Sequence, residues 1–138
     1  MKTVVGYTTG VFDMFHIGHL NILRNARSAC DYLIVGVTTD ELAVRRKGRA
    51  PIVPLFERME IVQNVRFVDD VVPQTTMDKM EAWRKLKFDV MFVGDDWKGS
   101  EAWAAYEREF GDVGVQLTYL PYTGHTSSHL LRSKVFGE

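Results

Sequence analysis

The chain has 138 residues, of which 46% are hydrophobic and 25% charged, and its formal net charge is −1. These values are typical of one globular domain with its own core, and a nearly neutral chain has no global basic field for nucleic acid. The single cysteine excludes an internal disulfide. No apolar run approaches the length of a membrane span, and the N-terminus does not resemble a leader peptide. We therefore expect a cytoplasmic protein with one domain, residues 1–138.

Short apolar runs alternate along the chain with patterns that are typical of helices. The runs expected to form strands are Thr3–Thr8, Tyr32–Thr38, Asp70–Val72, Val90–Val93 and Val115–Leu120. The expected helices lie near Leu20–Ala29, Leu55–Val65, Met77–Leu86, Glu101–Phe110 and Ser128–Val135. This alternation predicts an α/β protein whose parallel sheet is covered by helices on both faces. In such sheets ligands bind beyond the carboxyl ends of the strands.

The most informative segment runs from Gly10 to His19 and directly follows the first expected strand. Its histidines, His16 and His19, are three residues apart at an expected helix start, where they would share one face. A helix start offers backbone N–H groups without helical partners and the positive end of the helix dipole. Anions bind at such a position, and nucleotide phosphates are the usual ligands. Gly18 between the histidines would allow a ligand to approach the backbone closely.

A basic run, Arg45-Arg46-Lys47-Gly48-Arg49, lies in the least regular part of the chain, Arg45–Pro54. A solvated surface is the ordinary explanation for such a run. The run follows the second expected strand, however, and so it begins near the same sheet edge as the histidines. Long cationic side chains on a mobile lid could close there over a triphosphate.

Three further segments carry polar groups near expected strand or helix ends. Acidic residues follow the fourth strand in Gly94-Asp95-Asp96-Trp97-Lys98-Gly99, where they could hold hydroxyls, a base edge or a metal, or simply form a turn. Arg66–Val72 contains acids that could cap a turn or pair with Arg66. Hydroxyl residues in Thr123–Ser128 could cap the last helix or donate to phosphate oxygens.

Taken together, these segments resemble the cytidylyltransferases of the HxGH nucleotidyltransferase superfamily. The first segment resembles the family signature GxFDxxHxGH, and the other stretches resemble its RYVDEV, GDDWxG and RTxGIST motifs, in the same order along nearly the whole chain. The GDDWxG stretch is closest to the glycerol-3-phosphate cytidylyltransferases. The resemblance implies a single-domain, Rossmann-like parallel sheet of about five strands, commonly a homodimer. It also implies transfer of CMP from CTP to a phosphorylated polyol such as glycerol 3-phosphate, giving a CDP-alcohol and pyrophosphate.

The resemblance further implies roles for individual residues. His16, His19 and Lys47 would be catalytic: the histidines would donate hydrogen bonds to the α-phosphate and the bridging oxygen, and the lysine would neutralise the triphosphate. Asp13 would orient the histidine region, and Mg²⁺ would accompany the triphosphate without a metal site evident in the sequence. The implied substrate contacts are Gly10, Val11, Phe12, Asp13, Arg46, Arg66, Asp69, Gly94, Asp95, Tyr122, Thr123, Ser127 and Ser128.

The sequence departs from the family at Tyr122, where relatives have an arginine that contacts nucleotide phosphates. Compensation for that arginine is expected from Lys98, Arg132, Arg45 or Arg46. Other acceptors or nucleotides stay open, namely phosphocholine, phosphoethanolamine, or ATP in an adenylyltransferase, and so does a non-catalytic nucleotide-binding protein. Choline recognition would favour an aromatic cage, for which the chain offers Trp83, Trp97, Trp103, Tyr106 and Tyr122.

Overall fold

The computed structural model describes residues 2–95, 98–121 and 128–137. Within them, five parallel strands form one sheet in the order β3-β2-β1-β4-β5. The strands are β1 (Val5–Gly10), β2 (Tyr32–Thr38), β3 (Asp70–Gln74), β4 (Val90–Gly94) and β5 (Gln116–Leu120). The order reverses between β1 and β4, and a crevice forms at the carboxyl ends of strands at such a switch point. The predicted Rossmann-like α/β fold is confirmed.

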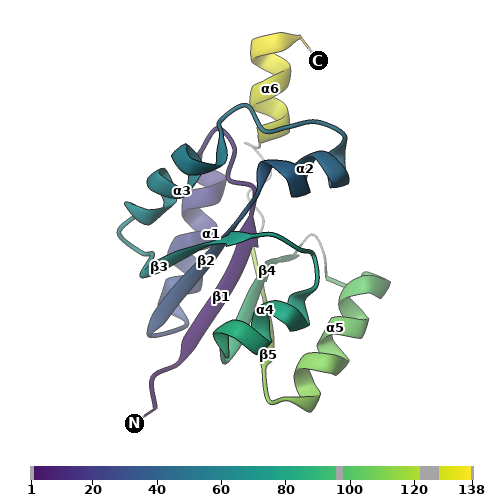
Figure 1. Cartoon of the computed structure of the whole chain (residues 1–138). Coiled ribbons are helices and arrows are strands. Elements are labelled where there is room, and N and C mark those ends of the chain that lie inside the picture. Colours follow the sequence, from purple (N-terminus) through teal and green to yellow (C-terminus); the bar gives the residue numbers. More distant parts are fainter. Residues whose placement is uncertain (1, 96–97, 122–127, 138) are drawn as a thin grey trace.

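Six helices connect and flank the strands in the described part of the chain. They are α1 (Ile17–Ser28), α2 (Asp40–Lys47), α3 (Leu55–Gln63), α4 (Lys79–Leu86), α5 (Glu101–Asp112) and α6 (Ser128–Phe136). Figure 1 shows α2 and α6 at the end of the sheet where β1 and β2 finish. No helix within the described residues is both long and apolar enough to span a membrane.

Alternate side chains of the strands enter two hydrophobic cores, one on each face of the sheet. On one face Leu33, Val35 and Val37 of β2 pack against Leu23 of α1 and Val62 of α3. On the other face Ile34 belongs to the core that α4 and α5 cover through Met80 and Phe110. Because β2 and β4 are buried on both faces, their sequences are nearly continuous apolar runs, which explains why these strand positions were predictable.

Helix α2 corrects one sequence-based expectation. The irregular stretch was expected to begin at Arg45, but Asp40–Lys47 is helical and only residues 48–54 remain irregular before α3. The hydroxyl of Thr39 caps the helix by accepting from the amide of Leu42 at 3.1 Å. Gly48 ends it in the left-handed region, with φ 78°. Three cations of the basic run, Arg45, Arg46 and Lys47, therefore lie in the last turn of a helix, a favourable position for cations in the helix dipole.

A buried arginine on α3 connects the elements around the carboxyl edge of the sheet. Arg58 is 1% exposed, and its guanidinium donates to the carbonyl oxygens of Val11, Thr38 and Val53, each at 2.7 Å. The same group pairs with the carboxylate of Asp40 at the start of α2. One side chain thus joins the turn after β1, the end of β2, the start of α2 and the loop before α3.

We expect Arg58→Met to lower the free energy of unfolding by about 3–5 kcal/mol, because the change leaves several buried acceptors without a donor. Urea denaturation followed by circular dichroism measures the loss. Arg84→Met is the matched control, since Arg84 is an exposed arginine in the last turn of α4, and it should change the free energy by less than about 0.5 kcal/mol. Similar losses for both variants would contradict the connecting role of Arg58.

Candidate active site

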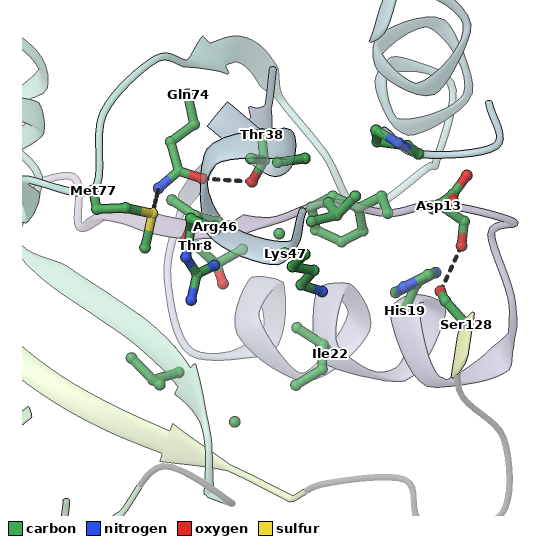
Figure 2. A pocket seen from close by; sticks show the side chains of 18 of the residues that line it. Thr8, Asp13, His19, Ile22, Thr38, Arg46, Lys47, Gln74, Met77 and Ser128 are labelled. Carbon is green, nitrogen blue, oxygen red and sulfur yellow. Dashed lines mark hydrogen bonds between the residues drawn. The ribbon is translucent and has the colours of Figure 1, made fainter. Parts of the chain in front are cut away.

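A cavity of about 1010 Å³ opens at the carboxyl edge of the sheet, beside the switch point between β1 and β4. Its size lies at the upper end of the range for ligand pockets, about 300–1,000 Å³. Figure 2 shows Asp13, His19 and Ser128 on one side of the cavity and Thr38, Gln74 and Met77 on the other, with Lys47 between them. The cavity therefore has room for two substrates side by side.

The two histidines at the start of α1 hold each other in place. Nδ1 of His16 accepts a hydrogen bond from the amide of Gly18 at 3.0 Å, and Nδ1 of His19 accepts from the amide of His16 at 3.2 Å. Their rings stack with centroids 3.8 Å apart, and both residues line the cavity. Because each Nδ1 accepts, each neutral ring carries its proton on Nε2. The pair therefore offers two Nε2–H donors.

Both imidazoles are neutral at pH 7. Burial lowers the pKa of His16, and burial together with the neighbouring His16 lowers the pKa of His19 to about 3. A neutral imidazole donates a hydrogen bond without bringing a charge of its own. The positive charge of the site therefore comes from other side chains.

Asp13 holds the histidine turn against two other segments. Its carboxylate, in a residue that is 3% exposed, accepts from the amides of Ile52 and Val53 at 2.8 and 2.9 Å. It also pairs with Arg132 of α6 at 3.0 Å, while its backbone carbonyl accepts from the hydroxyl of Ser128 at 2.6 Å. These bonds attach α6 and the loop after α2 to the turn between β1 and α1.

The turn itself has an unusual backbone. Phe12 and Met14 adopt positive φ values of 54° and 48°, which are uncommon for residues with side chains and which the surrounding structure must hold in place. The Phe12 ring packs edge-on against His19, with centroids 5.2 Å apart. A Cβ on Gly10 would come within 2.9 Å of that ring, so that glycine permits the packing.

Cations dominate the cavity wall. Arg46, Lys47 and Arg49 lie at the end of α2 and just beyond it, and Lys79 and Arg132 reach the cavity from α4 and α6. Burial lowers the pKa of Lys47, and the adjacent Arg46 lowers it further. Among the described residues that line the cavity, Asp13 is the one carboxylate, and its oxygens already accept the bonds given above. The wall therefore carries an excess of positive charge and attracts a polyphosphate.

The structure brings most of the sequence-predicted site residues together. The predicted site residues that line the cavity are Gly10, Val11, Phe12, Asp13, His16, His19, Arg46, Lys47, Gly94 and Ser128. Asp95 is not among them, and its carbonyl accepts from the amide of Lys98 at 3.1 Å. Tyr122, Thr123 and Ser127 lie outside the described residues. Of the cations expected to compensate for Tyr122, Arg46 and Arg132 line the cavity, but Arg45 and Lys98 do not.

The structure does not bring Arg66 and Asp69 to the cavity. Both residues lie between the end of α3 and the start of β3, so they belong to the amino edge of a sheet whose cavity is at the carboxyl edge. The Asp69 carboxylate accepts from the amide of Leu33 at 2.8 Å and pairs with Arg27 at 3.0 Å. In this structure Asp69 thus connects the beginnings of β2 and β3.

Sequence reasoning missed several cavity residues. Thr38 and Gln74 are the last residues of β2 and β3, and strand polarity alone would have placed them at this edge. Lys79 is the first residue of α4; a lysine there has no sequence feature that distinguishes it from an exposed one. No group of three or more His, Cys, Asp or Glu side chains that could hold a metal ion occurs among the described residues.

A family model described as cytidylyltransferase-like matches residues 7–134 of the chain. The chain belongs to this family. Glycerol-3-phosphate cytidylyltransferase from Bacillus subtilis (strain 168) is 31% identical over 139 residues, which cover 99% of each protein. This cytidylyltransferase-like chain is therefore an enzyme that transfers nucleotidyl groups.

Two other relatives of the cytidylyltransferase-like enzyme carry different names. FAD synthase from Pyrococcus abyssi (strain GE5 / Orsay) is 43% identical over 97 residues, and the match covers 70% of this chain but only 64% of that protein. The crystal structure of a lipopolysaccharide core biosynthesis protein from Thermoplasma volcanium GSS1 superposes with a TM-score of 0.75 at 26% identity, covering 91% of this chain and all of that one. The names of these relatives thus differ, although the chains are similar.

We expect His19 of the nucleotide-free cytidylyltransferase-like enzyme to stay neutral between about pH 7.5 and about pH 5, where a free histidine gains its proton. The reason is its pKa of about 3. Its ring nitrogen resonances, assigned by comparison with His19→Asn, should not shift over this range.

Because the unfolded chain does bind that proton, the free energy of unfolding should fall below about pH 6.5, by up to about 1.4 kcal/mol per pH unit. A His19 titration midpoint near 6.5 would overturn the assignment of neutral donors.

Proposed function

We propose that this enzyme transfers CMP from CTP to a phosphorylated polyol such as glycerol 3-phosphate, giving a CDP-alcohol and pyrophosphate. The observation that carries the proposal is the pair of Nε2–H donors on His16 and His19, at a helix start that faces a wall of cations. The full-length similarity to glycerol-3-phosphate cytidylyltransferase supports both the nucleotide and the acceptor.

In the proposed reaction an oxygen of the acceptor phosphate forms a bond to the α-phosphorus of CTP. The bond between that phosphorus and the α,β-bridging oxygen breaks, and its electron pair leaves with pyrophosphate. A dianionic acceptor phosphate has no proton to lose, so the reaction needs no general base. Positioning of the reactants and stabilisation of the charge on phosphorus oxygens are then the main contributions of the protein. Neutral histidines that donate hydrogen bonds fit this requirement.

The side chains divide these tasks. His16 and His19 donate from Nε2 to the α-phosphate and to the bridging oxygen, and Lys47 with Arg46 neutralises the β- and γ-phosphates. Asp13 and Ser128 position the histidine turn through the bonds described above. Nucleoside and phosphate contacts from Gly10, Val11, Gly94, Asp95, Tyr122, Thr123 and Ser127 are part of the same proposal.

Mg²⁺ is proposed to arrive with the triphosphate, because the described residues contain no cluster of metal ligands. No step above depends on it. We also propose that the enzyme forms a homodimer, as the family resemblance implies. Exposed apolar side chains on α3, such as Phe56 and Ile61, are available for contact with a second copy.

A second candidate is adenylyl transfer from ATP, which the similarity to FAD synthase supports. A pyrophosphate-release assay separates the two activities, with CTP or ATP offered together with glycerol 3-phosphate, phosphoethanolamine or FMN. We expect pyrophosphate only when CTP and glycerol 3-phosphate are both present, and mass spectrometry should then identify CDP-glycerol. Release with ATP and FMN but not with CTP would establish adenylyl transfer instead.

We expect His16→Ala and His19→Ala each to lower kcat by about 100-fold or more, which is the effect of removing a fixed donor to a developing negative charge. Thermal melting of each variant checks that the fold is retained. Ser28→Ala, at the far end of the same helix, is the control and should keep the kcat of the wild type. Near-normal rates in both histidine variants would reject the proposed roles.

A further inference from the structure

Lys79 is a buried cation at the start of α4, where Gln74, Met77 and Trp103 also line the cavity. The residue is 4% exposed, and its Nζ has one long hydrogen bond, to the hydroxyl of Thr9 at 3.5 Å. Within the described residues no carboxylate pairs with it. Buried ammonium groups are normally paired, because removal from water strongly disfavours the charge. Lys79 therefore has hydrogen-bonding capacity that a ligand can use.

A second cation faces the same space. Arg46 lines the cavity from the last turn of α2, and its charge adds to burial, the larger cause, in lowering the pKa of Lys79 to about 8. Lys79 is still mostly protonated at pH 7. Two cations that face one cavity repel each other, and an anion bound between them removes that repulsion. The arrangement is suited to an anionic group.

Several other polar groups near Lys79 already have hydrogen-bond partners within the protein. The hydroxyl of Thr38 donates to Oε1 of Gln74 at 2.7 Å, and Nε2 of Gln74 donates to the carbonyl of Thr76 at 3.2 Å. The hydroxyl of Tyr106 donates to the carbonyl of Met77 at 3.1 Å. Lys79, with three donors and one long bond among the described residues, thus has donors that can bind a ligand here.

This end of the cavity suits the acceptor. In Figure 2 Thr38, Gln74 and Met77 lie across the cavity from His19 and Asp13, with Lys47 between the two groups. The proposed phosphate site occupies the side of the histidines and Lys47, so an acceptor that approaches the α-phosphorus has this remaining space. Trp103 and Tyr106 also line it, but the Lys79 ammonium already lies 5.9 Å from the centre of the Trp103 ring. A second cation at that ring would therefore lie close to the positive charge of Lys79.

On the basis of the transfer reaction above, we propose that Lys79 selects the acceptor by charge. The site takes acceptor phosphates whose alcohol part is neutral or anionic and rejects those whose alcohol part carries an ammonium group. An aminoalcohol phosphate would place its cation near Lys79, and repulsion between charges a few ångströms apart is strong at a partly buried site. Lys79 is in this role a specificity-determining residue for the acceptor.

The test compares kcat/KM for glycerol 3-phosphate and for phosphoethanolamine at saturating CTP. We expect the wild type to prefer glycerol 3-phosphate by about 100-fold or more. Lys79→Met, which keeps the length of the side chain and removes its charge, should reduce this preference at least about tenfold, mainly through KM. Lys79→Arg should retain the preference, as should Lys85→Met, which removes an exposed lysine of the same helix.

Calorimetric titration of CTP separates acceptor selection from nucleotide binding. The Kd for CTP should be unchanged in Lys79→Met, and a large loss of CTP affinity would overturn the proposal by assigning Lys79 to the nucleotide. Equal use of both acceptors by the wild type, or an unchanged preference in a folded Lys79→Met, would also overturn it. If Lys79→Met does not fold, Lys79→Gln is measured in its place under the same criteria. Absence of transfer from CTP to either acceptor would instead reject the proposed function itself, on which this inference rests.

Discussion

The guanidinium of Arg58 satisfies backbone carbonyls at the place where the sheet ends. Parallel strands lose their neighbours at the carboxyl edge, so buried carbonyl groups there need donors from elsewhere. Arg58 supplies them to Val11, Thr38 and Val53, and its charge is balanced by Asp40. Because Val11 opens the turn that leads to the histidines and Asp40 begins α2, the positions of the histidines and of the basic last turn of α2 both depend on this one side chain.

The positive charge of the cavity and its fixed hydrogen-bond donors come from different residues. The imidazoles of His16 and His19 are neutral and fixed, so they offer hydrogen-bond donors in set orientations. Arg46, Lys47 and Lys79 provide the positive charge. Protonated histidines would add to the repulsion among these cations. Asp13 would be expected to repel phosphate, but two amides and Arg132 already bind its oxygens. The site thus contains a carboxylate for structural purposes and still presents a positive wall to a substrate.

The sequence was sufficient to predict the sheet, because the central strands β2 and β4 are buried on both faces and are nearly continuous in apolar residues, and helical patterns separate all five strands. The sequence did not predict α2, because most of its residues are charged and its apolar face is small. Thr39 and Gly48 are nevertheless ordinary signals for the two ends of a helix. Arg58 was recognisable in principle, since it shares the buried face of α3 with Leu55 and Val62 at helical spacing. Arg66 and Asp69 were selected by resemblance, whereas strand polarity places residues before β3 at the opposite edge. The burial of Lys79 depends on how α4 and α5 pack, and no local pattern expresses it.

The two ends of the cavity come from different parts of the chain. The histidines come from one continuous segment, the turn after β1 and the start of α1, stiffened by the strained backbone at Phe12 and Met14 and joined to α6 through Asp13. The other side is assembled from the ends of β2 and β3 and from α4 and α5, through Thr38, Gln74, Lys79 and Tyr106. A substitution on that second side leaves the hydrogen bonds of the histidine turn intact. The histidine turn can therefore stay the same while the second side of the cavity changes, which is consistent with the different enzyme names of its relatives.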